Sequence, residues 1–432
     1  MNSITDTKIQ MKWYDKTEMV LLACALSSIS VSFHITIWCL AALVANTLVK
    51  ICCGGLRYNR EKGFLWIMVA YWGLYLLSMA WTDQTATGWK EVGQLAPLAL
   101  FALVFLFSDM QYLDTRRIRI LFWCMTATMA TLFLVRSGVA LYRHRNELFP
   151  LDYFFEPDVF DSTHHTYISI YLAAGLAFLY HEVVVAWKNG SKWLKIAICA
   201  CAALLYCFLI CKNSRGGHLL LCLLGGIIVF DQLVWHKKIW RAIVLIVGFT
   251  LLGIGTHYVI PNSQARQTVV MVSSEEETLQ HHSDNRFLII GKALRAAKDN
   301  LPWGVGAGDR TAVLNGYYSE YEVTHRLSPK DPHNQFADTL ITTGIPGLAL
   351  LLAMIIWPFG VMLKNRGFKV VQNPDRWVLC AAMILLCPIV TALFESVLER
   401  QLGLLFFCLA YCLAAQIITL ENKNKFDIHE KS

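Results

Sequence analysis

The chain has 432 residues, of which 56% are apolar and only 16% are charged. Soluble domains carry about 25% charged residues, so this composition argues against a soluble globular protein. The net charge is +7, but the basic residues stand in short segments between apolar runs. That placement indicates membrane topology rather than binding of nucleic acid.

Twelve apolar runs are candidates for helices that cross a bilayer, and the division between the first two is the least certain. Ser27 to Ser30 and His34 are all that divide the first run from the second. The runs lie at about 18–31, 33–51, 64–81, 93–108, 118–135, 165–187, 194–211, 217–235, 240–259, 339–363, 377–394 and 402–420. We therefore expect an all-α polytopic membrane protein of about 12 transmembrane helices. It divides into spans 1–9 (1–259), a long loop (260–336), and spans 10–12 with a tail (337–432).

The distribution of lysine and arginine predicts the orientation. If both termini lie inside, the inner segments hold 23 of these residues and the short outer loops hold seven. The positive-inside rule favours this arrangement and exempts the long loop. No removable signal peptide is expected. All fourteen cysteines lie in or beside apolar runs, which indicates small buried hydrophobes rather than disulfides.

The long outer loop contains one predicted amphipathic helix. A polar stretch runs from Pro261 to His282, and Ser283 follows as a candidate helix cap. Apolar residues then repeat at helical spacing, at Phe287, Ile290, Leu294 and Ala297. This pattern predicts a helix on the membrane surface, and a glycine-rich turn from Pro302 to Gly308 ends it.

Two arginines are candidates for binding an anion at the outer face. Arg215 precedes Gly216 and Gly217 at the outer end of the eighth span, and the glycines permit close approach of the backbone to a ligand. The alternative is an arginine that extends to the interface from a helix end. Arg286 falls in the first turn of the amphipathic helix, where a cation is unfavourable unless an anion offsets it. The alternative there is a solvated surface charge.

His333 is the candidate general base. Asp331 is a plausible helix N-cap and Pro332 suits the first helical position, so we expect His333 in the first turn of the tenth span. The positive end of the helix would keep the imidazole neutral and able to accept a proton. The alternative is a boundary histidine at the membrane interface.

Other polar groups give weaker signals. The adjacent histidine pairs, His164-His165 and His281-His282, are poor chelators by themselves. No Asp-x-Asp pair occurs in the outer loops, which favours a reaction without metal. Glu395 and Glu399-Arg400 form either a helical ion pair or part of the site.

The stretch from Asn285 to Leu351 resembles the signature region of the O-antigen ligase and polymerase superfamily of bacterial inner membranes. The resemblance depends on Arg286, on the Pro302–Gly308 turn, and on His333-Asn334 followed by Gly344-Ile345-Pro346-Gly347. The twelve-span plan and the turn around Arg215 extend it along the chain.

The resemblance implies periplasmic transfer of a glycan from undecaprenyl diphosphate, without metal or nucleotide. No cofactor and no nucleic-acid partner are expected. It implies that His333, Arg215 and Arg286 are the catalytic residues. Further substrate contacts are expected from Arg310, Asn334, Gly304, Gly306 and Glu395. The expected acceptor is lipid A-core, which makes the chain an O-antigen ligase of the inner membrane.

Three other functions remain open at this stage. An O-antigen polymerase and a protein O-oligosaccharyltransferase differ from the ligase only in the acceptor, which the sequence does not reveal. A secondary transporter would also have twelve spans, but it would be expected to have two related halves with polar residues at midplane. In this sequence the polar candidates gather at one outer face.

Overall fold

The computed structural model describes residues 11–143, 145, 165–212, 214–235, 237–259, 286–319, 331–366 and 376–429. Within these ranges the chain is helical, and strand-like pairing is limited to one isolated bridge between Leu56 and Ser108. The prediction of an all-α polytopic membrane protein is confirmed. The polar stretch from Pro261 to His282 and the proposed cap Ser283 lie outside the described residues.

Twelve helices occupy the places of the twelve predicted runs. They are α1 (Trp13–Ser28), α2 (Phe33–Lys50), α3 (Trp66–Leu77), α4 (Thr85–Phe107), α5 (Thr115–Arg143), α6 (His165–Asn189), α7 (Lys192–Cys211), α8 (Arg215–Phe230), α9 (Ile239–Val259), α13 (Gln335–Arg366), α14 (Trp377–Thr391) and α15 (Gln401–His429). Two more helices, α11 (Arg286–Asp299) and α12 (Arg310–Ser319), lie in the long loop. The predicted division of the first two runs is confirmed, because α1 ends at Ser28 and α2 begins at Phe33.

Nine helices in the described part of the chain are long and apolar enough to cross a membrane. The apolar stretches described in α9 and α14 are shorter. Helix α1 has 16 residues and includes Asp15, Lys16 and Glu18, so it falls short of a span. Crossing of the bilayer by these three helices stays a prediction. Helix α15 is central, since 94% of its apolar window is buried.

A buried ion cluster attaches α1 to α2. The Lys50 ammonium lies 2.9 Å from Asp15 and 2.6 Å from Glu18, and the Lys50 side chain is only 1% exposed. Ser108 also donates a hydrogen bond to Glu18. Lys50 is therefore an internal structural charge.

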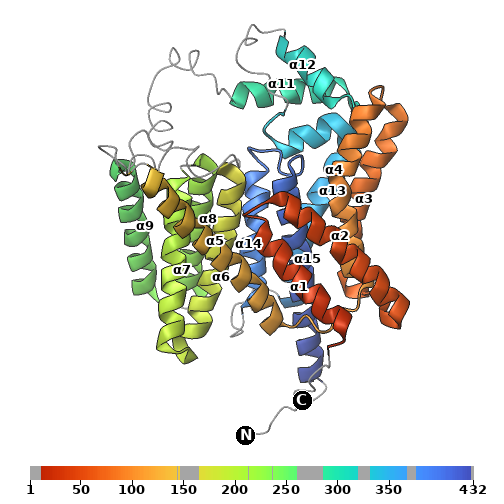
Figure 1. Cartoon of the computed structure of the whole chain (residues 1–432). Helices are drawn as coiled ribbons and strands as arrows, with labels where there is room; N and C mark the ends of the chain where they lie inside the picture. Colours follow the sequence, from red (N-terminus) through yellow and green to blue (C-terminus); the bar gives the residue numbers. More distant parts are fainter. Residues whose placement is uncertain are drawn as a thin grey trace.

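Helices α11 and α12 lie across one end of the bundle, opposite the end at which α15 finishes (Figure 1). We call this end the site end. Ala293, Ala296 and Ala297 of α11 are buried against Leu314 of α12 and Ile341 of α13. The predicted helix is confirmed, and Ala297 of its apolar face packs within the protein. Leu294 of the same face is 48% exposed, and the place of the helix on the membrane surface stays a prediction. Alanines permit close helix packing, and this tertiary contact selects the buried face.

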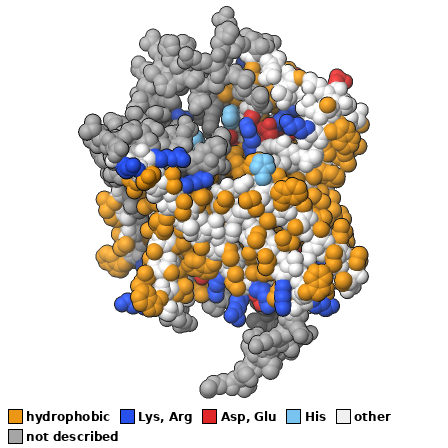
Figure 2. Space-filling model, in the orientation of Figure 1, with side chains coloured by type: hydrophobic (Ala, Val, Ile, Leu, Met, Phe, Trp, Pro, Cys, Tyr) orange, Lys and Arg blue, Asp and Glu red, His pale blue; other side chains and the backbone are white. Residues whose placement is uncertain are grey.

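The surface view is consistent with a membrane protein. On the face shown in Figure 2, hydrophobic side chains form a broad band across the bundle, and lysines and arginines gather at the lower edge of this band. Near the site end, acidic, basic and histidine side chains meet in a hollow on this face (Figure 2). Polar side chains on this face therefore gather beyond the apolar band, at the site end (Figure 2).

Candidate functional site

His333 lies in a tight turn just before α13. The Asp331 carboxylate accepts hydrogen bonds from the His333 backbone N–H, at 2.8 Å, and from the Ser396 hydroxyl, at 2.6 Å. His333 adopts φ 49°, in the left-handed region. Asn334 is the residue that caps the helix, because its side-chain oxygen accepts from the N–H of Ala337 at 2.8 Å.

This turn corrects the expectation for His333. The residue precedes α13, which begins at Gln335, and Asp331 closes the turn instead of capping the helix. A residue with positive φ cannot continue a right-handed helix. The position of His333 therefore follows from side-chain hydrogen bonds around the turn, and a place in the first helical turn no longer explains its chemistry.

The imidazole of His333 pairs with a buried carboxylate. Its Nδ1 atom lies 3.2 Å from Oε2 of Glu395, whose side chain is 2% exposed, whereas the His333 side chain is 27% exposed. A carboxylate at Nδ1 favours the tautomer that carries the proton there. In that tautomer Nε2 is the ring atom that accepts a proton, which is the state that a general base requires.

The segment that carries Glu395 is fixed to the start of α13. The Gln335 N–H donates to the carbonyl of Ala392 at 2.9 Å, and the Gln335 side-chain oxygen accepts from the N–H of Leu398 at 2.7 Å. The Asn334 amide also donates to the carbonyl of Leu393 at 2.8 Å. These bonds hold Glu395 in register with His333. Glu395 and Glu399 lie between α14 and α15 rather than on a helix, so the idea of a helical ion pair is wrong.

Arg215 begins α8 close to the same segment. Ser214 caps the helix by accepting a hydrogen bond from the N–H of Gly217 at 3.3 Å. A Cβ atom added at Gly216 would lie 3.4 Å from the ring of Phe394, the neighbour of Glu395. The glycines thus permit close packing of the turn against the protein, and this packing brings the Arg215 turn beside the Glu395 segment. Arg286 begins α11, and its side chain lies outside what the structure describes.

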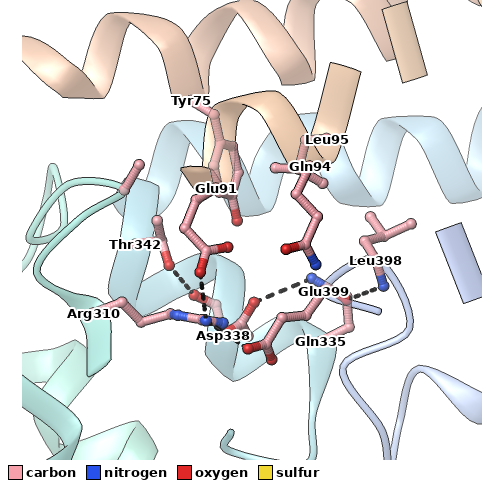
Figure 3. A pocket seen from close by; sticks show the side chains of 11 residues that line it. Tyr75, Glu91, Gln94, Leu95, Arg310, Gln335, Asp338, Thr342, Leu398 and Glu399 are labelled. Carbon is pink, nitrogen blue, oxygen red and sulfur yellow. Dashed lines mark hydrogen bonds and ion pairs between the residues drawn. The ribbon is translucent and has the colours of Figure 1, made fainter. Parts of the chain in front are cut away.

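Arg310 is the centre of a buried charge cluster, not an open substrate contact (Figure 3). Its guanidinium forms ion pairs with Asp338 of α13, with Glu399 at 2.6 Å and with Glu91 of α4 at 3.5 Å. The Arg310 side chain is 5% exposed. The cluster joins α12, α13, α4 and the segment before α15. Arg310 and Glu91 are 219 residues apart in the sequence, so no local sequence pattern could predict this cluster.

The charges and the burial of the cluster shift the pKa values of its members. Burial and the neighbouring carboxylates of Asp338 and Asp331 raise the pKa of Glu399 to about 8, although the Arg310 charge opposes this. The three carboxylates in turn raise the pKa of Arg310, whose burial acts in the opposite direction. Glu399 therefore holds a proton more tightly than an ordinary glutamic acid does. The small cavity beside it has room for about one water molecule.

Gly304 and Gly306, predicted as substrate contacts, pack closely against other parts of the protein. Both have positive φ, 74° and 91°. A Cβ at Gly304 would lie 2.6 Å from the carbonyl oxygen of Ile341, and one at Gly306 would lie 2.2 Å from the hydroxyl of Thr82. The glycines therefore fit the Pro302–Gly308 turn between α13 and the loop after α3. This packing accounts for glycine at both positions, and their role as substrate contacts stays a prediction.

Three described residues could together hold a metal ion: Asp331, His333 and Glu395, whose ligand atoms lie within 4.8 Å of one another. Both carboxylates already accept hydrogen bonds or pair with the imidazole. Of the histidine pairs considered above, His165 begins α6, while His164, His281 and His282 lie outside the described residues. The expectation of a metal-free reaction stays a prediction.

The comparisons with known proteins agree with the resemblance. Residues 200–352 match a family model described as O-antigen ligase, which is 153 of the 432 residues. The matched segment contains Arg215, Arg286 and His333 but ends before Glu395. A search of the curated proteins gave no match.

Proposed function

We propose that this chain, a member of the O-antigen ligase and polymerase superfamily, transfers O-antigen from undecaprenyl diphosphate to lipid A-core. In this proposal the protein is a multi-pass enzyme of a bacterial inner membrane and works at its periplasmic face. The donor is a lipid-linked glycan and the membrane holds its polyprenyl tail. The site end of the bundle is the periplasmic end.

The contact between His333 and Glu395 is the observation that carries the proposal. A partly exposed imidazole, backed by a buried carboxylate at 3.2 Å, is the arrangement expected of a general base. Glu395 was first considered as a substrate contact, but in this proposal it contacts His333 instead. Asp331 and the turn at His333 hold the ring near that carboxylate. The left-handed φ of His333 is a backbone strain of the kind that concentrates at functional sites.

The proposed reaction is a single displacement. A hydroxyl oxygen of the acceptor sugar attacks the anomeric carbon of the donor glycan, and its proton passes to Nε2 of His333. The bond between the anomeric carbon and the diphosphate oxygen breaks, and the electron pair leaves with undecaprenyl diphosphate. Attack opposite the leaving group inverts the configuration at the anomeric carbon.

Arg215 and Arg286 would stabilise the diphosphate as its charge develops. Planar guanidinium groups bind phosphate oxygens in a bidentate manner and need no metal for this. The packing of the Arg215 turn beside Phe394 supports a place for Arg215 near His333. We assign Arg310 a supporting role, because its guanidinium is already engaged by three carboxylates.

The alternatives differ in what accepts the glycan or in whether any bond is made. Polymerase and protein O-oligosaccharyltransferase use the same donor chemistry and would use the same base. A secondary transporter is disfavoured by the position of the candidate residues at the site end rather than at midplane. A transporter makes no covalent bond, so it would not need the paired His333 and Glu395 as a general base.

Deletion of the gene followed by analysis of lipopolysaccharide separates these functions. Full-length polymer retained on the lipid carrier is the result that the ligase proposal predicts. Single repeat units on the core would instead identify a polymerase, and normal lipopolysaccharide with unglycosylated proteins would identify the protein transferase. Complementation by the wild-type gene, but not by a His333→Ala gene expressed at the same level, is the control.

A further inference from the structure

The turn around Pro302 lies beside a membrane-spanning helix rather than above it. Helix α13, within the candidate span Gln335–Lys364, is interrupted at Gly344, where φ is 65° and ψ is −154°. Since a helix rises by about 1.5 Å per residue, the interruption is roughly 13 Å along α13 from its start at Gln335. The turn contacts α13 at this depth.

Backbone hydrogen bonds join the turn to the interrupted helix. The N–H groups of Val305 and Gly306 donate to the carbonyls of Ile341 and Thr342 at 2.8 and 2.9 Å. The N–H of Ile345 donates to the carbonyl of Pro302 at 2.8 Å. Non-helical backbone is tolerated at membrane depth where its polar groups are paired within the protein. These three bonds meet that requirement.

The turn has one buried side and one exposed side. Gly306, Ala307 and Gly308 are buried, and the N–H groups of Ala307 and Gly308 donate to the hydroxyls of Ser78 and Thr82 at the end of the α3 span. On the other side, Leu301 is 42% exposed and Trp303 is 61% exposed. The exposed side is apolar, whereas the buried side makes the polar contacts.

The exposed side continues the outward face of α13. Ile345, Leu352 and Ile356 are 52%, 39% and 62% exposed, and their spacings of seven and four residues place them on one face of the helix. This face belongs to a candidate membrane span, so lipid chains are its expected surroundings. Because the Ile345 N–H donates to the carbonyl of Pro302, exposed Leu301 and Trp303 lie beside Ile345, the residue of this face nearest the site end.

We propose that the segment Leu301–Trp303 inserts into the bilayer leaflet at the site end, with Trp303 at the boundary between acyl chains and headgroups. Tryptophan is enriched at this boundary because its ring is apolar and its N–H is polar. The partner is bilayer lipid. Helix α12, whose first residue is Arg310 of the buried cluster, begins seven residues after Trp303. This proposal is independent of the reaction that the protein catalyses.

Depth-dependent quenching of a fluorescent amino acid tests the proposal. The full-length chain carries the probe at position 303, in vesicles of phosphatidylethanolamine and phosphatidylglycerol that contain lipids with a nitroxide in the headgroup or deep in the acyl chain. Trp303 is largely exposed, so its replacement removes little packing. A probe at Leu352, farther along the same face, and one at exposed Ala312 of α12 are the controls.

We expect the headgroup nitroxide to quench the probe at position 303 more strongly than the deep nitroxide does. The order should be reversed at position 352, and neither nitroxide should quench at position 312. If the probe at 303 behaves like that at 312, and aqueous iodide quenches both equally, the segment lies in water and the proposal is wrong. Stronger quenching at 303 by the deep nitroxide would also contradict the boundary position of Trp303.

Discussion

Replacement of Gly344 by alanine should disrupt the contact between α13 and the turn that crosses it. Its φ of 65° and ψ of −154° lie in a region open essentially to glycine, where another residue costs of the order of 1–3 kcal/mol. The new Cβ would also lie 2.0 Å from the carbonyl oxygen of Pro302. The turn must move to relieve this steric overlap, and its movement breaks three hydrogen bonds worth about 1 kcal/mol each.

The expected loss is therefore about 3–5 kcal/mol, allowing for partial relaxation. With an unfolding entropy of about 2.1 cal/mol/K per residue, this lowers the Tm of the 432-residue chain by roughly 3–6 °C. Thermal unfolding in detergent, followed by tryptophan fluorescence, measures it. Gly360→Ala in the same helix is the matched control, because a Cβ there meets nothing within 4 Å. A Gly344→Ala protein as stable as Gly360→Ala would refute the reasoning.

Three further predictions concern orientation, charge and pH. A cysteine in place of exposed Ala312 should react with an impermeant thiol reagent in intact cells with a permeabilised outer membrane; reaction only after lysis of the inner membrane would reverse the topology. Arg215→Lys and Arg286→Lys should each remain strongly impaired in transfer at normal protein levels, because lysine loses the bidentate geometry, and near-normal rates for both would mean that charge alone suffices. The pKa of Glu399 is about 8 in the folded protein, whereas its ordinary value is 4.5. Between these values the folded state holds a proton that the unfolded state releases. The stability of the protein should therefore fall as pH rises from about 4.5 to about 8. Tm measured across this range should fall less in Glu399→Gln, and equal slopes in the two proteins would exclude Glu399 as the source.

Local patterns in the sequence predicted the helices well. Apolar runs of about twenty residues are decisive in a membrane protein, because backbone groups there must be paired within the helix. The division near Ser28 and the helix beginning at Arg286 also followed from local signals. The buried face of that helix did not, because contacts with Leu314 and Ile341 selected it, and these residues are distant in sequence.

The sequence identified candidate residues of the site better than it predicted their contacts. His333 and Glu395 were both singled out, but their contact joins residues 62 apart and has no local pattern. Asp331 was expected to cap a helix, and the competing bond to the His333 N–H closes a turn instead. Arg310 was expected as a substrate contact, and its burial among carboxylates was not predicted. Its three acidic partners come from separate elements that only the fold brings together.

The central claim is glycan transfer with His333 as the base, and reconstituted transfer tests it most directly. Purified protein is mixed with undecaprenyl diphosphate-linked glycan and lipid A-core, and the mass of the product is measured. We predict that the wild type joins the glycan to lipid A-core and releases undecaprenyl diphosphate. His333→Ala should still bind the donor but be slower by about a hundredfold or more, as expected for loss of a general base. Transfer by His333→Ala at more than about a tenth of the wild-type rate, or no transfer by the wild type, would contradict the account.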